Sequence, residues 1–185
     1  DPDQIARALR QQLETQDVLV TSAGVSMGEK DYMLAVLRDL GAELHFWKVA
    51  MRPGRPLGFG TWQGKPIFAL PGNPVSSMVT FEIFCRPALL KMLGHQDLRV
   101  PTETALSTER LVKKEELRLY YRCKLKLTQG QLWATSTGPQ DSHRLHSLVQ
   151  ADALMILPEN QSVIEKGQPL QVLRVDQPIA KSFQG

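Results

Sequence analysis

The chain has 185 residues, of which 42% are hydrophobic, and this composition excludes a disordered protein and allows one medium-sized domain or two small ones. The 22 basic and 19 acidic residues leave a net charge of +3, which is too small to indicate nucleic-acid binding but suits a small anionic ligand. No apolar run predicts a membrane-spanning helix and no basic start precedes an apolar stretch, so we expect a cytoplasmic protein without a signal peptide or a membrane partner.

Helix and strand patterns alternate in the first half of the chain. Ile5, Leu9 and Leu13 recur at helical spacing, and the apolar run 18–20 is typical of a buried parallel strand. The further expected elements are a helix over 33–40, strands over 44–49, 57–62 and 66–70, and a helix over 75–93 that bends near Pro87. This order predicts a three-layer αβα domain with a mostly parallel sheet, which we place at residues 1–97.

The second half, from Pro101 onward, reads as strands only. Residues 117–127 alternate between apolar and polar side chains, which predicts one buried face and one basic, solvated face that includes Arg122. Further strands are expected over 132–137, 153–157 and 170–175. The pattern predicts a small all-β barrel domain, which we place at residues 98–185.

The two cysteines, Cys85 and Cys123, lie in unrelated segments and form no C-x-x-C pair. This spacing gives no indication of a metal or redox motif. We expect two free, buried thiols.

The first segment with chemical potential follows the buried strand and precedes a helix. In open parallel sheets, ligands bind beyond the carboxyl ends of strands, and small residues with hydroxyl groups can hold a phosphate there. The candidate phosphate-binding residues are Thr21, Ser22, Gly24, Ser26 and Gly28. The alternative is an ordinary strand-to-helix connection that happens to be small and polar.

The second segment is a stiff basic loop, in which Arg52 and Arg55 alternate with two prolines and a glycine. Guanidinium groups bind phosphate and other tetrahedral oxyanions in a bidentate manner. The loop is therefore a candidate oxyanion site, and ordinary surface arginines are the alternative.

The third segment joins a strand to a helix and should lie beside the first. It contributes further candidate phosphate-binding residues, which are Pro71, Gly72, Asn73, Pro74 and Ser76. A helix N-terminus favours an anion. Asn73 or Ser76 could instead serve only as the helix cap.

Asp31 is the acid that ends the first segment. It could cap the following helix. Among anion-binding groups, it could instead bridge to Mg²⁺ or orient a substrate.

Together these segments resemble one family. Residues 21–32, 51–56 and 70–76 resemble the molybdopterin-binding region of MoeA and of the gephyrin E domain in composition, order and spacing. Residues 138–143, Leu157-Pro158 and Gly167 resemble the small C-terminal β-barrel of the same family. The resemblance covers essentially the whole chain, which is similar to a C-terminal fragment of those proteins.

The resemblance implies a transferase of molybdenum cofactor biosynthesis, a molybdopterin molybdotransferase. Such an enzyme takes adenylylated molybdopterin and molybdate, releases AMP with the help of Mg²⁺ or Zn²⁺, and leaves molybdenum on the dithiolene. It also implies a homodimer in the full-length parent, with a cleft built from both subunits. Molybdopterin adenylyltransferase and molybdoenzymes are the implied protein partners.

Carried over by position, the resemblance assigns Asp31 as the catalytic and metal-binding acid. It assigns Arg52, Arg55, Arg122 and Ser142 to molybdate or oxyanion binding, and Pro71 and Pro74 to the rigid loop beside the site. Two positions depart from the family. Ala23 and Asp141 stand where glycine is common, and a side chain at residue 23 favours a negative φ.

Two other functions are alternatives to catalysis. One is a molybdopterin-binding or scaffold module of the gephyrin type, without turnover. The other is a relative that adenylylates molybdopterin, and the Pro-Gly-Arg-Pro loop and the C-terminal barrel argue against it.

Overall fold

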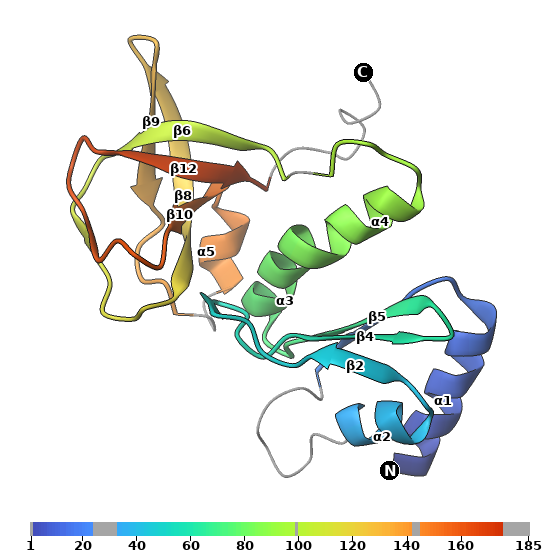
Figure 1. Cartoon of the computed structure of the whole chain (residues 1–185). Coiled ribbons are helices and arrows are strands. Elements are labelled where there is room, and N and C mark those ends of the chain that lie inside the picture. The colour runs from blue at the N-terminus through green and yellow to red at the C-terminus, as the bar shows by residue number, and fades with distance from the viewer. Residues whose placement is uncertain (1, 24–32, 99, 142–144, 176–185) are drawn as a thin grey trace. The chain divides into compact units, whose positions relative to one another are not determined.

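The computed structural model describes residues 2–23, 33–98, 100–141 and 145–175, and the chain divides after Arg86 into two compact units. The elements of the first unit are α1 (Pro2–Thr15), β1 (Leu19–Ser22), α2 (Met33–Asp39), β2 (Glu43–Phe46), β3 (Met51–Arg52), β4 (Gly58–Trp62), β5 (Lys65–Leu70), α3 (Pro74–Thr80) and the π-helical turn η1 (Phe81–Cys85) (Figure 1). No helix in the described part of the chain is long and apolar enough to cross a bilayer.

The first unit is a layered α/β structure around a sheet with strand order β1-β5-β4-β2. Figure 1 shows α1 and α2 on one face of this sheet and α3 on the other, which confirms the predicted layers. The core between α1, α2 and the sheet contains Leu9, Leu13, Leu37 and Ile67, each at most 7% exposed.

The prediction of a mostly parallel sheet needs correction. β1 and β5 are parallel, but β4 is antiparallel to both β5 and β2. The cause is the two-residue connection at Gln63 and Gly64, both with positive φ, which makes β4 and β5 a hairpin. The described sheet is therefore mixed.

The expected bend near Pro87 is the π-helical turn η1. The N–H of Arg86 bonds to the carbonyl of Phe81, five residues earlier, and α4 (Arg86–Met92) starts there. Proline has no N–H and its ring clashes with the carbonyl four residues before it, so a widened turn ahead of Pro87 accommodates the ring.

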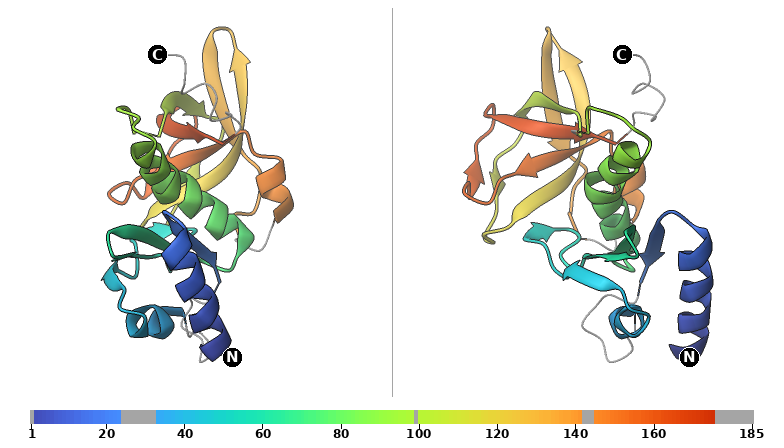
Figure 2. Two further views of the ribbon diagram at one scale, coloured as in Figure 1. Left: turned by 90° about the vertical axis from the view of Figure 1, so that its right-hand side faces the viewer. Right: turned by 45° about the vertical axis from the view of Figure 1, so that its right-hand side comes forward.

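The second unit contains a closed barrel in which each strand pairs with two neighbours, in the order β10-β12-β6-β9-β8 and back to β10. Its elements are β6 (Thr102–Ser107), β7 (Leu111–Val112), β8 (Arg118–Thr128), β9 (Gln131–Ser136), α5 (Leu145–Val149), β10 (Ala153–Leu157), β11 (Val163–Ile164) and β12 (Pro169–Arg174). Figure 2 shows the yellow to red strands curling around one interior. The barrel prediction is confirmed, but the expectation of strands only was wrong, since α5 is a helix.

The basic face predicted for β8 is only partly solvated. Lys124 and Lys126 are exposed, whereas Tyr120 and Arg122 are buried. The segment after β9 covers this part of the strand, because the Gln140 side chain bonds to both the N–H and the C=O of Arg122, at 2.8 and 3.2 Å. A period-two pattern cannot show that a second segment covers the polar face.

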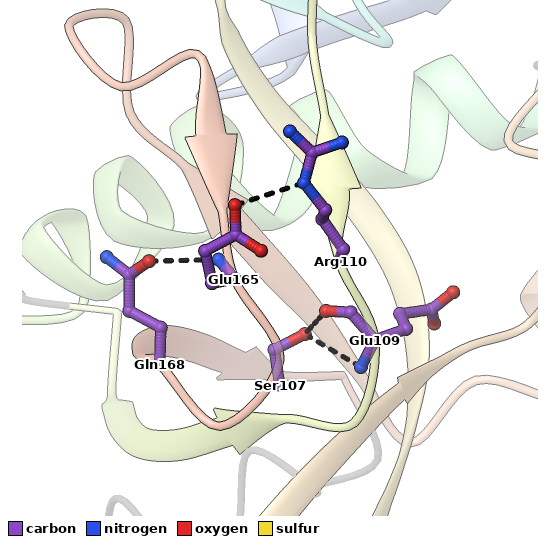
Figure 3. A network of polar contacts seen from close by, with 5 residues as sticks. All are labelled: Ser107, Glu109, Arg110, Glu165 and Gln168. Atoms are coloured by element: carbon purple, nitrogen blue, oxygen red, sulfur yellow. Dashed lines mark hydrogen bonds and ion pairs between the residues drawn. The ribbon is translucent and has the colours of Figure 1, made fainter.

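A polar network fixes two turns of the barrel against each other (Figure 3). Ser107, at the end of β6, is fully buried and its hydroxyl donates to the carbonyl of Glu109 at 2.6 Å. The Ser107 N–H donates to the carbonyl of Gln168 at 3.0 Å. On the surface of the same region, Arg110 pairs with Glu165 at 3.0 Å.

Cys85 and Cys123 are both free and fully buried, as the sequence predicts. Burial raises the pKa of each thiol from 9.0 to about 12. Both groups therefore stay protonated and unreactive in the folded chain at neutral pH.

Candidate functional site

The first and third predicted segments meet where β1 and β5 end. The two strands are parallel in register from Leu19 and Ile67 to Ser22 and Leu70. The two segments stay together beyond the strands, because the N–H of Ala23 donates to the carbonyl of Leu70 at 3.1 Å. Thr21 and Ser22 therefore lie beside the loop that starts at Pro71, as expected for the carboxyl ends of parallel strands.

Ala23 adopts a φ of 83°, so the expectation that it favours a negative φ was wrong. Its N–H bond to Leu70 holds the left-handed conformation that the family's glycine would take freely. A Cβ added at Gly72 would lie 3.1 Å from the Ala23 methyl, so the two loops touch closely at this point.

The hydroxyl group of Thr21 lies at the end of β1. Its Oγ1 atom is buried, and no hydrogen-bond partner for it is found in the described part of the chain. Leaving a buried hydroxyl unpaired costs about 1–3 kcal/mol. The atom lies at the end of β1, where it can donate to the oxygen of a bound phosphate.

The loop from Pro71 to Pro74 is held by its own hydrogen bonds. The Asn73 side chain accepts from the N–H groups of Val75 and Ser76, at 3.1 and 3.3 Å, so Asn73 is the cap of α3. Ser76 is buried, and the neighbouring Ser77 hydroxyl donates to the carbonyl of Pro71. The described contacts of Asn73 are structural, and its role toward a ligand stays a prediction.

The basic loop packs against the same helix. Pro53 and Gly54 are buried, and a Cβ added at Gly54 would lie only 2.4 Å from Cγ2 of Thr80 in α3. The carbonyl of Arg55 accepts from the N–H groups of Val49 and Leu57, which fixes the loop from both sides. The side chains of Arg52 and Arg55 are exposed and can reach an oxyanion.

Arg122 lies in the barrel with its side chain fully buried. Its Nη2 atom donates to the carbonyls of Pro139 and Asp141, at 3.4 and 3.1 Å, whereas Nε and Nη1 have no hydrogen-bond partner among the described residues. Burial lowers the pKa of Arg122, and the charge of Asp141 opposes this effect. Arg122 therefore positions the segment that contains Pro139 and Asp141, and its role in oxyanion binding stays a prediction.

Five assigned residues lie outside the described residues, namely Gly24, Ser26, Gly28, Asp31 and Ser142. No group of three or more His, Cys, Asp or Glu side chains suited to a metal occurs among the residues that the structure describes. The metal assignment thus depends on Asp31 and on ligand oxygens.

Sequence reasoning missed Ser77 and Thr80, which connect the second and third segments. The Thr80 hydroxyl donates to the carbonyls of Ser76 and Ser77, at 2.8 and 3.0 Å, and its methyl group faces Gly54. The adjacent serines at 76 and 77 gave no signal of which one faces the loop. The helical spacing of Ser77 and Thr80 on one face is the only sequence hint.

Known proteins are similar to this chain over most of its length. A family model described as "Probable molybdopterin binding domain" matches residues 1–91, and one described as "MoeA C-terminal region (domain IV)" matches residues 104–175. The predicted domain boundary between residues 97 and 98 falls between the two matches and stays a prediction.

Two relatives and one solved structure show the extent of the similarity. The molybdopterin molybdenumtransferase of Synechococcus elongatus is 40% identical over 93% of this chain and 42% of its own length. The gephyrin of Dictyostelium discoideum is 34% identical over 86% of this chain and 25% of its own length. The molybdopterin biosynthesis moea protein from Pyrococcus horikosii has the same fold, with a TM-score of 0.78 and 24% identity over 96% of this chain and 42% of that chain. The chain thus spans less than half the length of each.

Proposed function

Because this chain belongs to the MoeA and gephyrin family of molybdenum cofactor biosynthesis proteins, we propose that it forms the substrate-binding part of a molybdopterin molybdotransferase. The substrates are adenylylated molybdopterin and molybdate. The products are AMP and molybdopterin with molybdenum on its dithiolene.

The observation that carries the proposal is that the first segment contacts the loop that leads into α3, and the second segment contacts α3 itself. The Ala23–Leu70 hydrogen bond joins the first segment to the third, and Gly54 against Thr80 joins the second to the same helix. The first unit thus contains a buried Thr21 hydroxyl, without a partner among the described residues, and a loop with two exposed guanidinium groups. Such donors suit a phosphorylated substrate and a tetrahedral oxyanion.

Within this proposal, each described group has a separate task. Thr21 and Ser22 bind the phosphate of molybdopterin beside the Pro71 loop, which is kept rigid by the cap at Asn73. Arg52 and Arg55 bind the molybdate. Arg122 and Ser142 in the second unit are the further residues assigned to oxyanion binding.

Asp31 is the proposed acid for Mg²⁺ or Zn²⁺. Mg²⁺ is commonly bound by one or two carboxylates together with substrate phosphates, so one aspartate beside a phosphate site is compatible with it. When bound, the ion would neutralise charge that develops on the phosphate oxygens.

The proposal includes a homodimer of the full-length parent, with a catalytic cleft formed by two subunits, and the cytoplasm as its location. Molybdopterin adenylyltransferase would supply the substrate and molybdoenzymes would receive the product. This 185-residue chain alone would then bind ligand with negligible turnover.

The experiment is Asp31→Asn in the full-length parent, with molybdate-dependent AMP release as the measurement. Asn can still cap a helix but lacks the charge, so we expect stability to change by no more than about 0.5 kcal/mol. AMP release should fall by at least about a hundredfold, as for the loss of one electrostatic group in a site. Asp39→Asn, at the exposed end of α2, is the matched control.

Normal AMP release by Asp31→Asn would refute the assignment of Asp31. Ligand binding without AMP release by the unmutated parent would favour the non-catalytic binding or scaffold function instead. A fall in activity that only matches a loss of stability would leave Asp31 as a helix cap.

A further inference from the structure

A small pocket lies at the end of β5, entirely within the first unit. It has a volume of about 230 Å³ and is lined by Leu70, Ser77, Met78, Phe81 and Glu82. Ligand sites for drug-sized molecules measure about 300–1,000 Å³, so this pocket suits one ring system rather than a whole nucleotide. Nothing in the assigned site uses it.

The lining residues come to one side because of their spacing. Ser77 and Phe81 are four residues apart, and so are Met78 and Glu82, which places both pairs on one face of a helix. The π-helical turn η1 begins at Phe81 and widens the helix there. Such turns are frequent at functional sites.

Glu82 is the acidic residue of the pocket, and its position is fixed by Arg86. Its Oε2 atom lies 3.4 Å from Nη1 of Arg86, and the two side chains are 24% and 10% exposed. The other lining side chains are Leu70, Met78, Phe81 and the hydroxyl of Ser77. A carboxylate is therefore presented beside apolar and aromatic surface.

We propose that this pocket binds the pyrimidine end of the pterin, with Glu82 accepting hydrogen bonds from its N3–H and 2-amino groups. This inference rests on the proposed function, and it assigns the end of the substrate that the phosphate site leaves open. A carboxylate offers two acceptors side by side, and the pterin edge offers two donors side by side. Phe81 and Met78 provide contacts for the ring face.

Adenine is a poor match for the same pocket. Its N1 atom is an acceptor next to the 6-amino donor, so one carboxylate oxygen would face a lone pair instead of a hydrogen. The pocket therefore discriminates the pterin end of the substrate from the AMP end.

The helix sets the distance between the proposed phosphate end and the proposed pterin end of the bound substrate. Glu82 lies nine positions after the cap Asn73, which at 1.5 Å per residue is about 13.5 Å. The phosphate site lies beside Asn73, so the substrate would extend along α3 and η1 with its phosphate at one end and its pterin at the other.

The test compares pterin with lumazine, in which a carbonyl replaces the 2-amino group. The chain is titrated with each compound, and the fluorescence of the ligand is followed. We expect a pterin Kd at least about tenfold below that of lumazine, as for the loss of one charge-assisted hydrogen bond. The Glu82→Gln variant should lose this preference, because its amide group places a donor against a donor. Glu14→Gln, at an exposed position in α1, is the matched control.

Equal affinity of the unmutated chain for pterin and lumazine would overturn the proposal, and this result needs no variant to fold. A preference that survives in Glu82→Gln would overturn it as well. The outcome is separable from that of the proposed function, because AMP release by the parent is measured independently. AMP release without pterin discrimination would exclude only the pocket, and the reverse result would exclude only the catalytic function.

Discussion

Gly54 allows the basic loop to pack against α3, and its replacement by alanine tests this contact. Gly54 has a φ of 103°, a value that favours glycine. An added Cβ would also lie 2.4 Å from Cγ2 of Thr80, whose side chain is fully buried. Gly54→Ala therefore combines backbone strain with a steric clash.

The size of the effect follows from these two terms. A left-handed alanine costs about 1–2 kcal/mol, of which about 0.4–1 kcal/mol is offset by the smaller entropy of the unfolded chain. Overpacking of a filled core adds about 1–3 kcal/mol. We expect Gly54→Ala to lower the free energy of unfolding by about 1–4 kcal/mol.

Two variants separate the backbone strain from the steric clash. Gly64→Ala carries only the strain, since its φ is 82° and no atom lies within 4 Å of the added Cβ. Thr80→Ser removes the clashing methyl group and keeps the hydroxyl that donates to Ser76. In the double variant with Gly54→Ala, it should restore at least about 1 kcal/mol relative to the sum of the single changes.

The assay is urea unfolding followed by tryptophan fluorescence, with molybdate binding measured on the folded variants. The reasoning fails if Gly54→Ala costs no more than Gly64→Ala, or if Thr80→Ser gives no rescue. We also expect weaker molybdate binding in folded Gly54→Ala, because the displaced loop carries the arginines.

Three further results are expected. Arg55→Ala should weaken molybdate binding by about 1.5–3 kcal/mol without lowering the Tm, and unchanged affinity in calorimetry would make Arg55 an ordinary surface residue. Burial raises the pKa of Cys85 and Cys123 from 9.0 to about 12, so the contribution of these two thiols to the free energy of unfolding should be fully present below pH 9 and be lost as the pH rises toward 12. Chemical unfolding across this pH range measures the loss, and a free energy of unfolding that does not change would contradict it. Ser107→Ala should lower the free energy of unfolding by about 1–2 kcal/mol, because the hydroxyl is buried and hydrogen-bonded (Figure 3). Arg110→Gln should change it by less than about 0.5 kcal/mol, because the ion pair of Arg110 is exposed. Equal effects of the two substitutions in urea unfolding would contradict this contrast.

Local patterns predicted the main elements and the meeting of two site segments. Ile5, Leu9 and Leu13 marked α1, and the apolar residues before Thr21 marked a strand that ends at the site. The expected burial of that strand was wrong in part, because Leu19 is buried whereas Val20 is 39% exposed. These predictions succeed because hydrophobic periodicity and strand ends are properties of short stretches of chain.

Most predictions that failed concern features that depend on residues far apart in sequence. The burial of Arg122 depends on Gln140, eighteen positions later, and the left-handed Ala23 depends on a bond to Leu70. The strand β6 was missed because three of its six side chains are exposed and polar, so no alternation was visible. The contact of Gly54 with Thr80 likewise appears only in three dimensions.

The measurement that tests the central claim most directly is molybdate-dependent AMP release from adenylylated molybdopterin, with the full-length parent and this chain assayed side by side. We expect turnover by the parent, and ligand binding with negligible turnover by the chain. No AMP release by a folded parent that binds the substrate would contradict the proposed catalysis, and robust molybdate insertion by the chain alone would contradict a cleft built from two subunits.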